Sequence, residues 1–237
     1  MSTRKSTPDE IRRRFDGDVE RFSNLETGQS ATMDAPLTLD LIARAAAAVN
    51  PRAGSLLDIG CGAGNYTLKL LQCLPLRAVT LIDLSRPMLD RAVERIGAAA
   101  SPEIEAWQCD IRDAAMPAGR FDVAVAAATL HHLRGDDEWT RVFAAVYQAL
   151  KPGGSFWISD LVAHRTHAIE DLMTRRYGEY LAAVQGAEYR DRVLAYIAAE
   201  DTPRPLAWQL DGLLRSGFRD VEVLHKNTCF AAFGAIK

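Results

Sequence analysis

The sequence lacks long apolar runs and a strong net charge of either sign. No stretch approaches the roughly 20 consecutive apolar residues of a membrane-spanning helix. The polar segment Met1–Asp18 has no apolar core of the kind that marks a signal peptide. The 28 lysines and arginines nearly balance 31 aspartates and glutamates, and the formal net charge is -3. Such a balance gives no general attraction to nucleic acid or anionic lipid, so we expect a soluble cytoplasmic protein with no membrane partner.

Cysteine is also scarce, and its spacing excludes two common uses. The chain has no C-x-x-C pair, which a zinc ribbon or a thioredoxin-like site would need. The four cysteines are Cys61, Cys73, Cys109 and Cys229. Their scatter favours reduced thiols in a cytosolic protein. Asp160, His164 and His167 are an alternative set of metal ligands, but they rest on helical spacing alone. We therefore expect no metal site.

A glycine-rich loop follows the first pattern of a buried strand. Leu56, Leu57 and Ile59 form the short apolar run of a strand that is buried on both faces. The segment Asp58–Gly64 then reads D-x-G-x-G-x-G, and a helical pattern begins at Asn65. Strand, glycine loop and helix open a nucleotide-binding βαβ unit. The spacing differs from the G-x-G-x-x-G loop that binds a pyrophosphate, so the loop predicts a nucleotide-like ligand of another kind.

Two aspartates stand at the ends of the next predicted strands. Asp83 ends the strand Ala78–Ile82, where a carboxylate can accept hydrogen bonds from both hydroxyls of a ribose. The alternative is a turn or capping aspartate. Asp110 follows the strand Ile104–Cys109 and could accept from an adenine amino group, with Ile111 against the ring. Taken alone, Asp110 would be only a loop residue.

Two adjacent histidines follow the fourth predicted strand, Phe121–Ala127, whose small residues would let a ligand approach its end. His131 and His132 are candidate catalytic bases, because a histidine with an ordinary pKa near 6.5 can accept a proton at neutral pH. A hydroxyl or ammonium nucleophile must lose such a proton when it reacts. The alternative is that one or both histidines only shape the pocket or bond to backbone.

The order of the predicted elements indicates an α/β domain. Four strand–helix units between Ser55 and Asp160 are typical of a parallel sheet with helices on both faces. A helix with apolar residues from Ile11 to Phe22 precedes them, and a Lys151–Gly154 turn precedes the fifth strand. Two closing strands follow a helical stretch, and their tight connection predicts an antiparallel pair. We expect one domain over 1–237, with a helical lid at 1–50, a ligand-binding core at 51–162, an inserted helical lid at 163–204, and a helix and closing strands at 205–237.

Five segments resemble the motifs of the class I S-adenosylmethionine (AdoMet) methyltransferases, in order and at the usual spacing. They are LLDIGCGAGNYTLKLL, VTLIDLSRPMLDRA, WQCDIRD, FDVAVAAATLHHL and LKPGGSFWISD. The resemblance implies a Rossmann-like, seven-stranded, mostly parallel sheet whose last strand is antiparallel. It also implies AdoMet as cofactor and S-adenosylhomocysteine (AdoHcy) as its product. The residues implied to bind it are Asp58, Gly60, Cys61, Gly62, Gly64, Asp83, Leu84, Met88, Asp110, Ile111 and Ala127.

Within that family, the segments FDGDVERF, DIRD and CFAAFGAIK resemble the bacterial tRNA wobble-uridine branch, which includes carboxy-AdoMet synthases. Those enzymes hold the extra carboxylate with an arginine in the helix before the C-terminal Gly-Phe pair. Gly212 occupies that place here, and the nearby Arg215 faces another direction. We therefore expect ordinary AdoMet as the methyl donor.

The expected activity is methyl transfer to an O, N or C nucleophile by a monomer or homodimer. A small molecule is the expected acceptor and tRNA the alternative, because the basic segment Arg4–Arg14 is either a solvated helix face or a contact with an anionic substrate. A carboxy-AdoMet synthase-like enzyme and a non-catalytic AdoMet-binding protein also remain open. The glycine spacing and the HHL segment argue against an NAD-dependent oxidoreductase.

Overall fold

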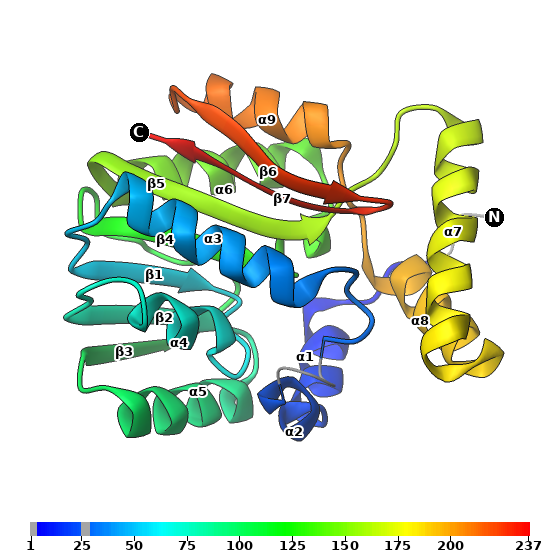
Figure 1. The fold of residues 1–237 in the computed structure, drawn as a ribbon, viewed down its shortest axis with the longest axis horizontal. Coiled ribbons are helices and arrows are strands. Elements are labelled where there is room, and N and C mark those ends of the chain that lie inside the picture. The colour runs from blue at the N-terminus through cyan, green and yellow to red at the C-terminus, as the bar shows by residue number, and fades with distance from the viewer. Residues whose placement is uncertain (1–3, 25–28) are drawn as a thin grey trace.

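The computed structural model describes residues 4–24 and 29–237, and its strands form a seven-stranded sheet in the order β3-β2-β1-β4-β5-β7-β6 (Figure 1). The strands are β1 (Ser55–Ile59), β2 (Ala78–Asp83), β3 (Glu103–Gln108), β4 (Phe121–Ala127), β5 (Leu150–Leu161), β6 (Val221–Asn227) and β7 (Phe230–Ile236). Neighbours from β3 to β5 pair in parallel, whereas β7 is antiparallel to both β5 and β6. The predicted fold class is therefore confirmed, including the antiparallel last strand.

Helices cover both faces of this sheet (Figure 1). They are α1 (Pro8–Asp16), α2 (Val19–Ser23), α3 (Ala35–Val49), α4 (Asn65–Leu71), α5 (Arg86–Ala99), α6 (Asp136–Ala149), α7 (His167–Gln185), α8 (Ala187–Glu200) and α9 (Leu206–Arg215). Because successive side chains of a strand point to opposite faces, Leu57 and Ile59 join the core under α6 and α9, and Leu56 joins the core under α3, α4 and α5. The apolar run in β1 thus reflects burial on both faces.

The helices α1, α2, α7 and α8 lie at the edge of the sheet where the parallel strands end (Figure 1). The N-terminus of α1 has the capping box that the sequence predicts, with reciprocal bonds between Thr7 and Glu10. A small apolar cluster around Tyr177 and Leu181 of α7 and Phe230 of β7 joins the α7–α8 hairpin to the sheet. Residues 1–3 and 25–28 of the predicted N-terminal lid lie outside the described part of the chain. Among the described helices, none is both long and apolar enough to span a membrane.

Two predictions about the helices are wrong. The apolar spacing from Ile11 to Phe22 predicts one helix, but the helix ends at Asp16 and a separate α2 begins at Val19. The intervening Gly17 has a low helix propensity, and the Phe15 and Phe22 rings still lie 5.6 Å apart across the break. The predicted strand–helix units also number one too many, because the described chain between β3 and β4 has turns and no helix.

The predicted turn at Lys151–Gly154 lies inside the fifth strand. Leu150 pairs with Phe121 and Ser155 pairs with Val123, so the intervening residues form an irregularity in β5. Gly153 has a φ of 76° and its N–H donates to the carbonyl of Lys237. The sequence pattern therefore marks a real change of direction, but the strand resumes its pairing on both sides of it.

Candidate cofactor and acceptor site

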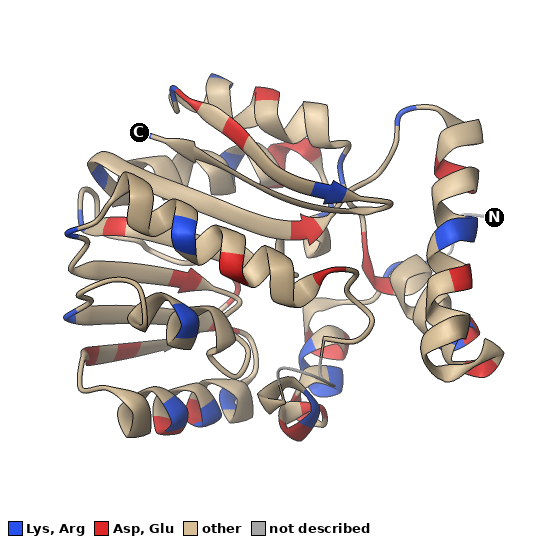
Figure 2. Cartoon of the chain, viewed as in Figure 1, with Lys and Arg blue, Asp and Glu red and all other residues tan. Residues whose placement is uncertain are grey.

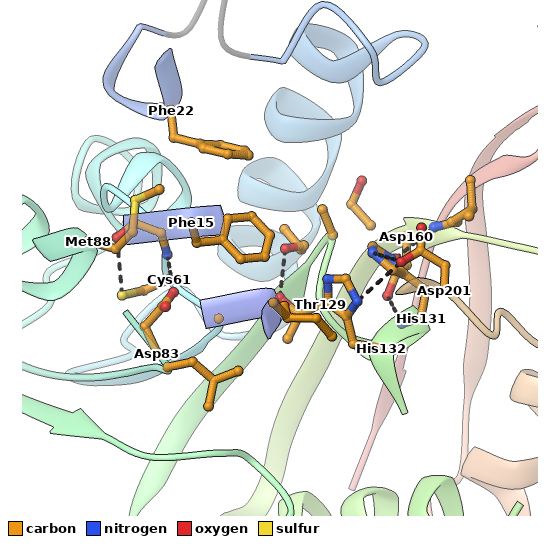
Figure 3. Close-up of a pocket in the computed structure, with 18 of the residues that line it drawn as sticks. Phe15, Phe22, Cys61, Asp83, Met88, Thr129, His131, His132, Asp160 and Asp201 are labelled. Carbon is orange, nitrogen blue, oxygen red and sulfur yellow. Dashed lines mark hydrogen bonds and ion pairs between the residues drawn. The ribbon is translucent and has the colours of Figure 1, made fainter. Parts of the chain in front are cut away.

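A cavity of about 230 Å³ lies at the carboxyl ends of the parallel strands, beneath α1 and α2. Of the residues predicted to bind the cofactor or to act in catalysis, all except Gly64 line this cavity. Figure 3 shows Asp83, Cys61 and Met88 on one side and the His131–His132 pair on the other. Phe15 and Phe22 of the N-terminal helices lie above the space between them. The cavity therefore brings the two predicted groups of site residues together.

The three glycines of the loop after β1 serve different purposes. A Cβ atom on Gly60 would lie 2.0 Å from Oγ1 of Thr129, so this position needs glycine for the close approach of two loops. Gly62 has a φ of 50°, and a Cβ there would have no described atom within 4 Å. Its backbone thus faces open space in the cavity, as close approach to a ligand requires. Gly64 instead lies against Ala92 and Ile96 of α5, which is why it does not line the cavity.

The two acidic residues of the βαβ unit face different partners. The carboxylate of Asp58 accepts a hydrogen bond from Oγ1 of Thr67 at 2.6 Å, and its burial raises its pKa to about 7. Asp58 therefore ties β1 to α4. Asp83 accepts from the N–H of Gly62 at 2.9 Å and from the N–H of Ser85 at 2.8 Å. Burial raises the pKa of Asp83 to about 6, and new donors from a ligand would favour its ionised form.

The remaining predicted cofactor residues line the same side of the cavity. Leu84 and Met88 follow β2 at the start of α5, and Ala127 is the last residue of β4. Cys61 is buried in the glycine loop, and burial raises the pKa of its thiol well above the ordinary value. Asp110 and Ile111 lie in the turn after β3, with the Asp110 carboxylate bonded to Arg112. These residues thus combine apolar side chains with the carboxylate of Asp110, in addition to the carboxylates of Asp58 and Asp83.

The two histidines lie in a short 3-10 turn, Leu130–His132, directly after β4. Nδ1 of His131 bonds to Oδ1 of Asp160, whose Oδ2 also accepts from the backbone N–H of Leu130 at 2.8 Å. Oδ1 of Asp201 lies 3.7 Å from Nε2 of His131 and 3.2 Å from Nδ1 of His132. Asp160 at the end of β5 therefore fixes the turn, and Asp201 bridges the two imidazoles.

These neighbours give the two histidines different charge states at neutral pH. Burial opposes the charged form of His131, but the carboxylates of Asp160 and Asp201 outweigh it and raise its pKa to about 9. Burial and the charge of His131 lower the pKa of His132. His132 is therefore the neutral member of the pair. Its Nε2 is buried without a hydrogen-bond partner in the described structure, and such an atom calls for an explanation.

Sequence reasoning missed Asp201 and the contacts that α1 makes with α8. Arg14 donates to both carboxylate oxygens of Glu200, with Nη2 and Oε2 2.6 Å apart. The same helix places the ring of Phe15 edge-on to His132, with ring centroids 6.0 Å apart. No local pattern points to these pairs, because each joins segments that are far apart in the sequence.

The alternative metal ligands do not come together. Asp160 bonds to His131, whereas Nδ1 of His164 lies 2.9 Å from Oε2 of Glu170. Among the described residues, His131, His132 and Asp201 offer ligand atoms within 4.8 Å of one another. The charge of a protonated His131 already balances one of the adjacent carboxylates, so the absence of a metal requirement stays our prediction.

Comparison with known proteins defines the family. Residues 56–154 match the family model of a methyltransferase domain. Over 191 residues the chain is 30% identical to carboxy-S-adenosyl-L-methionine synthase of Trichodesmium erythraeum. This match covers 77% of this chain and 72% of that protein. The chain is also 30% identical over 171 residues to trans-aconitate 2-methyltransferase of Deinococcus radiodurans, covering 72% of this chain and 60% of that protein. The chain belongs to the class I AdoMet-dependent methyltransferases, whose cofactor is AdoMet.

A solved structure shares the fold across the whole chain. The 1,6-didemethyltoxoflavin-N1-methyltransferase of Burkholderia thailandensis, solved with bound 1,6-didemethyltoxoflavin and AdoHcy, superposes with a TM-score of 0.65 at 17% identity. The match covers 100% of this chain and 93% of that one. By contrast, the chain spans only 51–60% of the length of three curated relatives.

Proposed function

We propose that this protein is an AdoMet-dependent methyltransferase that acts on a small molecule. The observation that carries the proposal is the unpartnered, buried Nε2 of His132, a residue that lines the same cavity as the glycine loop and Asp83. A cofactor pocket alone would serve a binding protein. A neutral histidine in its lining also offers a group that can accept a proton from a second molecule.

The residues on the cofactor side fit AdoMet. The backbone at Gly62 leaves room for a ligand to pass close to the loop, and Asp83 would accept from ribose hydroxyls. The carboxylate of Asp110 would accept from the adenine amine beside Ile111. When bound, AdoMet supplies a methyl carbon that its sulfonium makes electrophilic.

The residues on the acceptor side would orient and deprotonate the nucleophile. We assign the proton to Nε2 of His132, because this imidazole is neutral while His131 is charged at pH 7. Asp201 lies against Nδ1 of His132 and would stabilise the imidazolium that forms. Phe15 covers His132 from the side of α1. Exclusion of water by this lid would strengthen the electrostatic interactions inside the cavity.

The cavity lining favours a largely apolar acceptor with one O–H or N–H group. Aromatic residues supply much of the wall, namely Phe15, Phe22, Tyr66, Tyr177, Tyr196 and Phe230. Three of the four arginines that line the cavity pair with carboxylates within the chain, and the fourth, Arg134, donates to the backbone carbonyls of Ser6 and Glu200. Arg14 binds Glu200, Arg21 binds Asp18, and Arg112 binds Asp110. An acceptor with several carboxylates would therefore find no uncommitted counter-charge among these three side chains.

The surface around the cavity gives less support to tRNA as the acceptor. Arg4 pairs with Glu10 and Arg12 pairs with Asp16, so the basic N-terminal segment is partly neutralised by its own helix. Figure 2 shows basic and acidic residues interspersed along α5 and around α1 and α2. Tight binding of nucleic acid usually relies on a stripe of one sign.

A transfer assay tests the proposed function. The protein would be incubated with AdoMet that carries an isotopically labelled methyl group, in parallel with a small-molecule extract and with bulk tRNA. We expect label to appear in a small molecule whose mass has grown by one CH₂ group. Label in tRNA would overturn the acceptor class. Binding of AdoHcy without any transfer would instead indicate a non-catalytic AdoMet-binding protein.

The protein is expected to show no preference for carboxy-AdoMet over AdoMet. Gly212 lies on α9, where a Cβ atom would come within 3.0 Å of the Phe143 ring. Arg215 pairs with Asp211. Neither Gly212 nor Arg215 lines the cavity. Calorimetric titration with the two ligands is the measurement. A lower dissociation constant for carboxy-AdoMet would contradict this prediction and indicate another basic side chain at the carboxylate.

Ligand binding is expected to slow hydrogen exchange in α1, α2 and α8 more than in the buried strands. These helices line the cavity. Near the end of α8, Ala198 accepts a hydrogen bond from Lys5, which precedes α1, and Glu200 pairs with Arg14 of α1. Segments that close over a site are drawn from the less stable parts of a fold. Exchange would be followed by mass spectrometry with and without AdoHcy, with α9 as an internal control. Equal exchange in both states would argue against a lid.

A further inference from the structure

The side chain of Arg112 fixes the carboxylate of Asp110 at the wall of the cavity. Oδ1 of Asp110 accepts from the backbone N–H of Arg112 at 3.0 Å and from its Nε at 2.8 Å. Oδ2 accepts from Nη2 of the same guanidinium. Both residues line the cavity. Arg112 thus binds Asp110 through a planar fork, a geometry that a lysine cannot reproduce.

The number of bonds leaves Asp110 little capacity for a ligand. A carboxylate has about four lone-pair sites, two on each oxygen. The three donors of Arg112 occupy two on Oδ1 and one on Oδ2. One site on Oδ2 therefore remains, which suits a single N–H donor. A ligand that presents only an acceptor at this place would face an ionised carboxylate without a bond.

The guanidinium of Arg112 also contacts α6. Its Nη1 lies 3.4 Å from Oε1 of Glu138 in the first turn of α6, and Oε2 of Glu138 accepts from the backbone N–H of Arg134 at 2.7 Å. The orientation of Asp110 is therefore coupled to α6 and not only to its own loop. Such support is what a precise binding group needs.

We propose that Arg112 is a positioning residue that makes the cavity select a purine with an exocyclic amine, by leaving Asp110 one acceptor site for that amine. The proposal rests on the proposed function, which places adenine beside Asp110. It predicts that Arg112 affects ligand discrimination and not merely ligand affinity.

The test compares AdoHcy with an analogue that has hydrogen in place of the exocyclic amine. Dissociation constants would be measured by calorimetry for the unmodified protein, Arg112→Gln, Arg112→Lys and a matched control, Arg141→Gln. Arg141 lies in an exposed ion pair with Asp137 on α6. The unmodified protein and the control should prefer AdoHcy by roughly 10- to 100-fold, the value of a hydrogen bond to a charged group.

Arg112→Gln should weaken AdoHcy binding by about tenfold and change binding of the analogue by less than about twofold. Equal losses for both ligands, or a preference as strong as in the unmodified protein, would overturn the proposal. If Arg112→Gln does not fold, Arg112→Lys decides, since it keeps the charge but loses the fork and should still lose most of the preference. Failure of the unmodified protein to bind AdoHcy would refute the proposed function itself.

Discussion

Replacement of His132 by alanine is expected to lower kcat by roughly 10²- to 10⁴-fold, the usual contribution of a general base. The dissociation constant of AdoHcy should change little, because His132 faces the acceptor side of the cavity. Single-turnover transfer and calorimetry would separate the two effects. His164→Ala is the matched control, since His164 bonds to Glu170 and does not line the cavity.

The pH dependence of kcat provides an independent check on this assignment. Because burial lowers the pKa of His132, activity should fall only at a pH below the ordinary histidine value near 6.5. Because the pKa of His131 is raised to about 9, its charge, and the hold it gives on Asp201, should be lost as the pH rises through about 9. A plot of kcat against pH should therefore show a broad maximum, with a fall below the ordinary histidine pKa and a second fall above about 9.

Two results would contradict the role of His132. One is a kcat for His132→Ala within about twofold of the unmodified protein, since removal of a general base costs roughly 10²-fold or more. The other is loss of activity on chelation with EDTA, because His131, His132 and Asp201 would then act as metal ligands. In the second case the pH dependence of kcat would also change with the metal concentration.

Replacement of Asp83 by alanine is expected to cost about 1.5–3 kcal/mol in AdoHcy binding, through the loss of charge-assisted hydrogen bonds to the ribose. The loss corresponds to roughly 10- to 150-fold in the dissociation constant. Asp83 also accepts from the N–H of Gly62, so the melting temperature without ligand must be measured alongside. Asp90→Ala is the control, since Asp90 forms an exposed pair with Arg86 on α5.

Binding should also weaken as the pH falls through about 6 in the unmodified protein. Burial raises the pKa of Asp83 to that value, and a protonated carboxyl accepts fewer hydrogen bonds from a ribose. An unchanged dissociation constant for Asp83→Ala, with no pH dependence near 6, would refute the ribose assignment.

Much of the fold could be predicted because its signals are local. The apolar run in β1 and the capping box at Thr7 each lie within a few residues and survive in the structure. The two errors about helices arose where a regular pattern was extended across an interruption. The apolar spacing from Ile11 to Phe22 predicts one helix, but the chain forms two helices separated at Gly17. The chain between β3 and β4 lacks the helix that a βα repeat predicts.

The cofactor side of the site and the histidine pair could be predicted, but the partners of these side chains could not. The loop with Gly62 and the aspartates after β2 and β3 follow from a motif, since the carboxyl ends of parallel strands meet at one edge. Asp201 follows α8 and lines the cavity only because of how that helix packs, and its neighbour Glu200 binds Arg14 of α1. The orientation of Asp110 by Arg112 is a matter of side-chain geometry, which spacing does not encode.

The most direct measurement is a crystal structure of the protein with AdoHcy. We expect the ribose hydroxyls within hydrogen-bond distance of Asp83, the adenine amine on Oδ2 of Asp110, and the sulfur atom toward the side of the cavity that His132 lines. AdoHcy bound outside this cavity, or bound within it with the ribose away from Asp83, would contradict the proposed function.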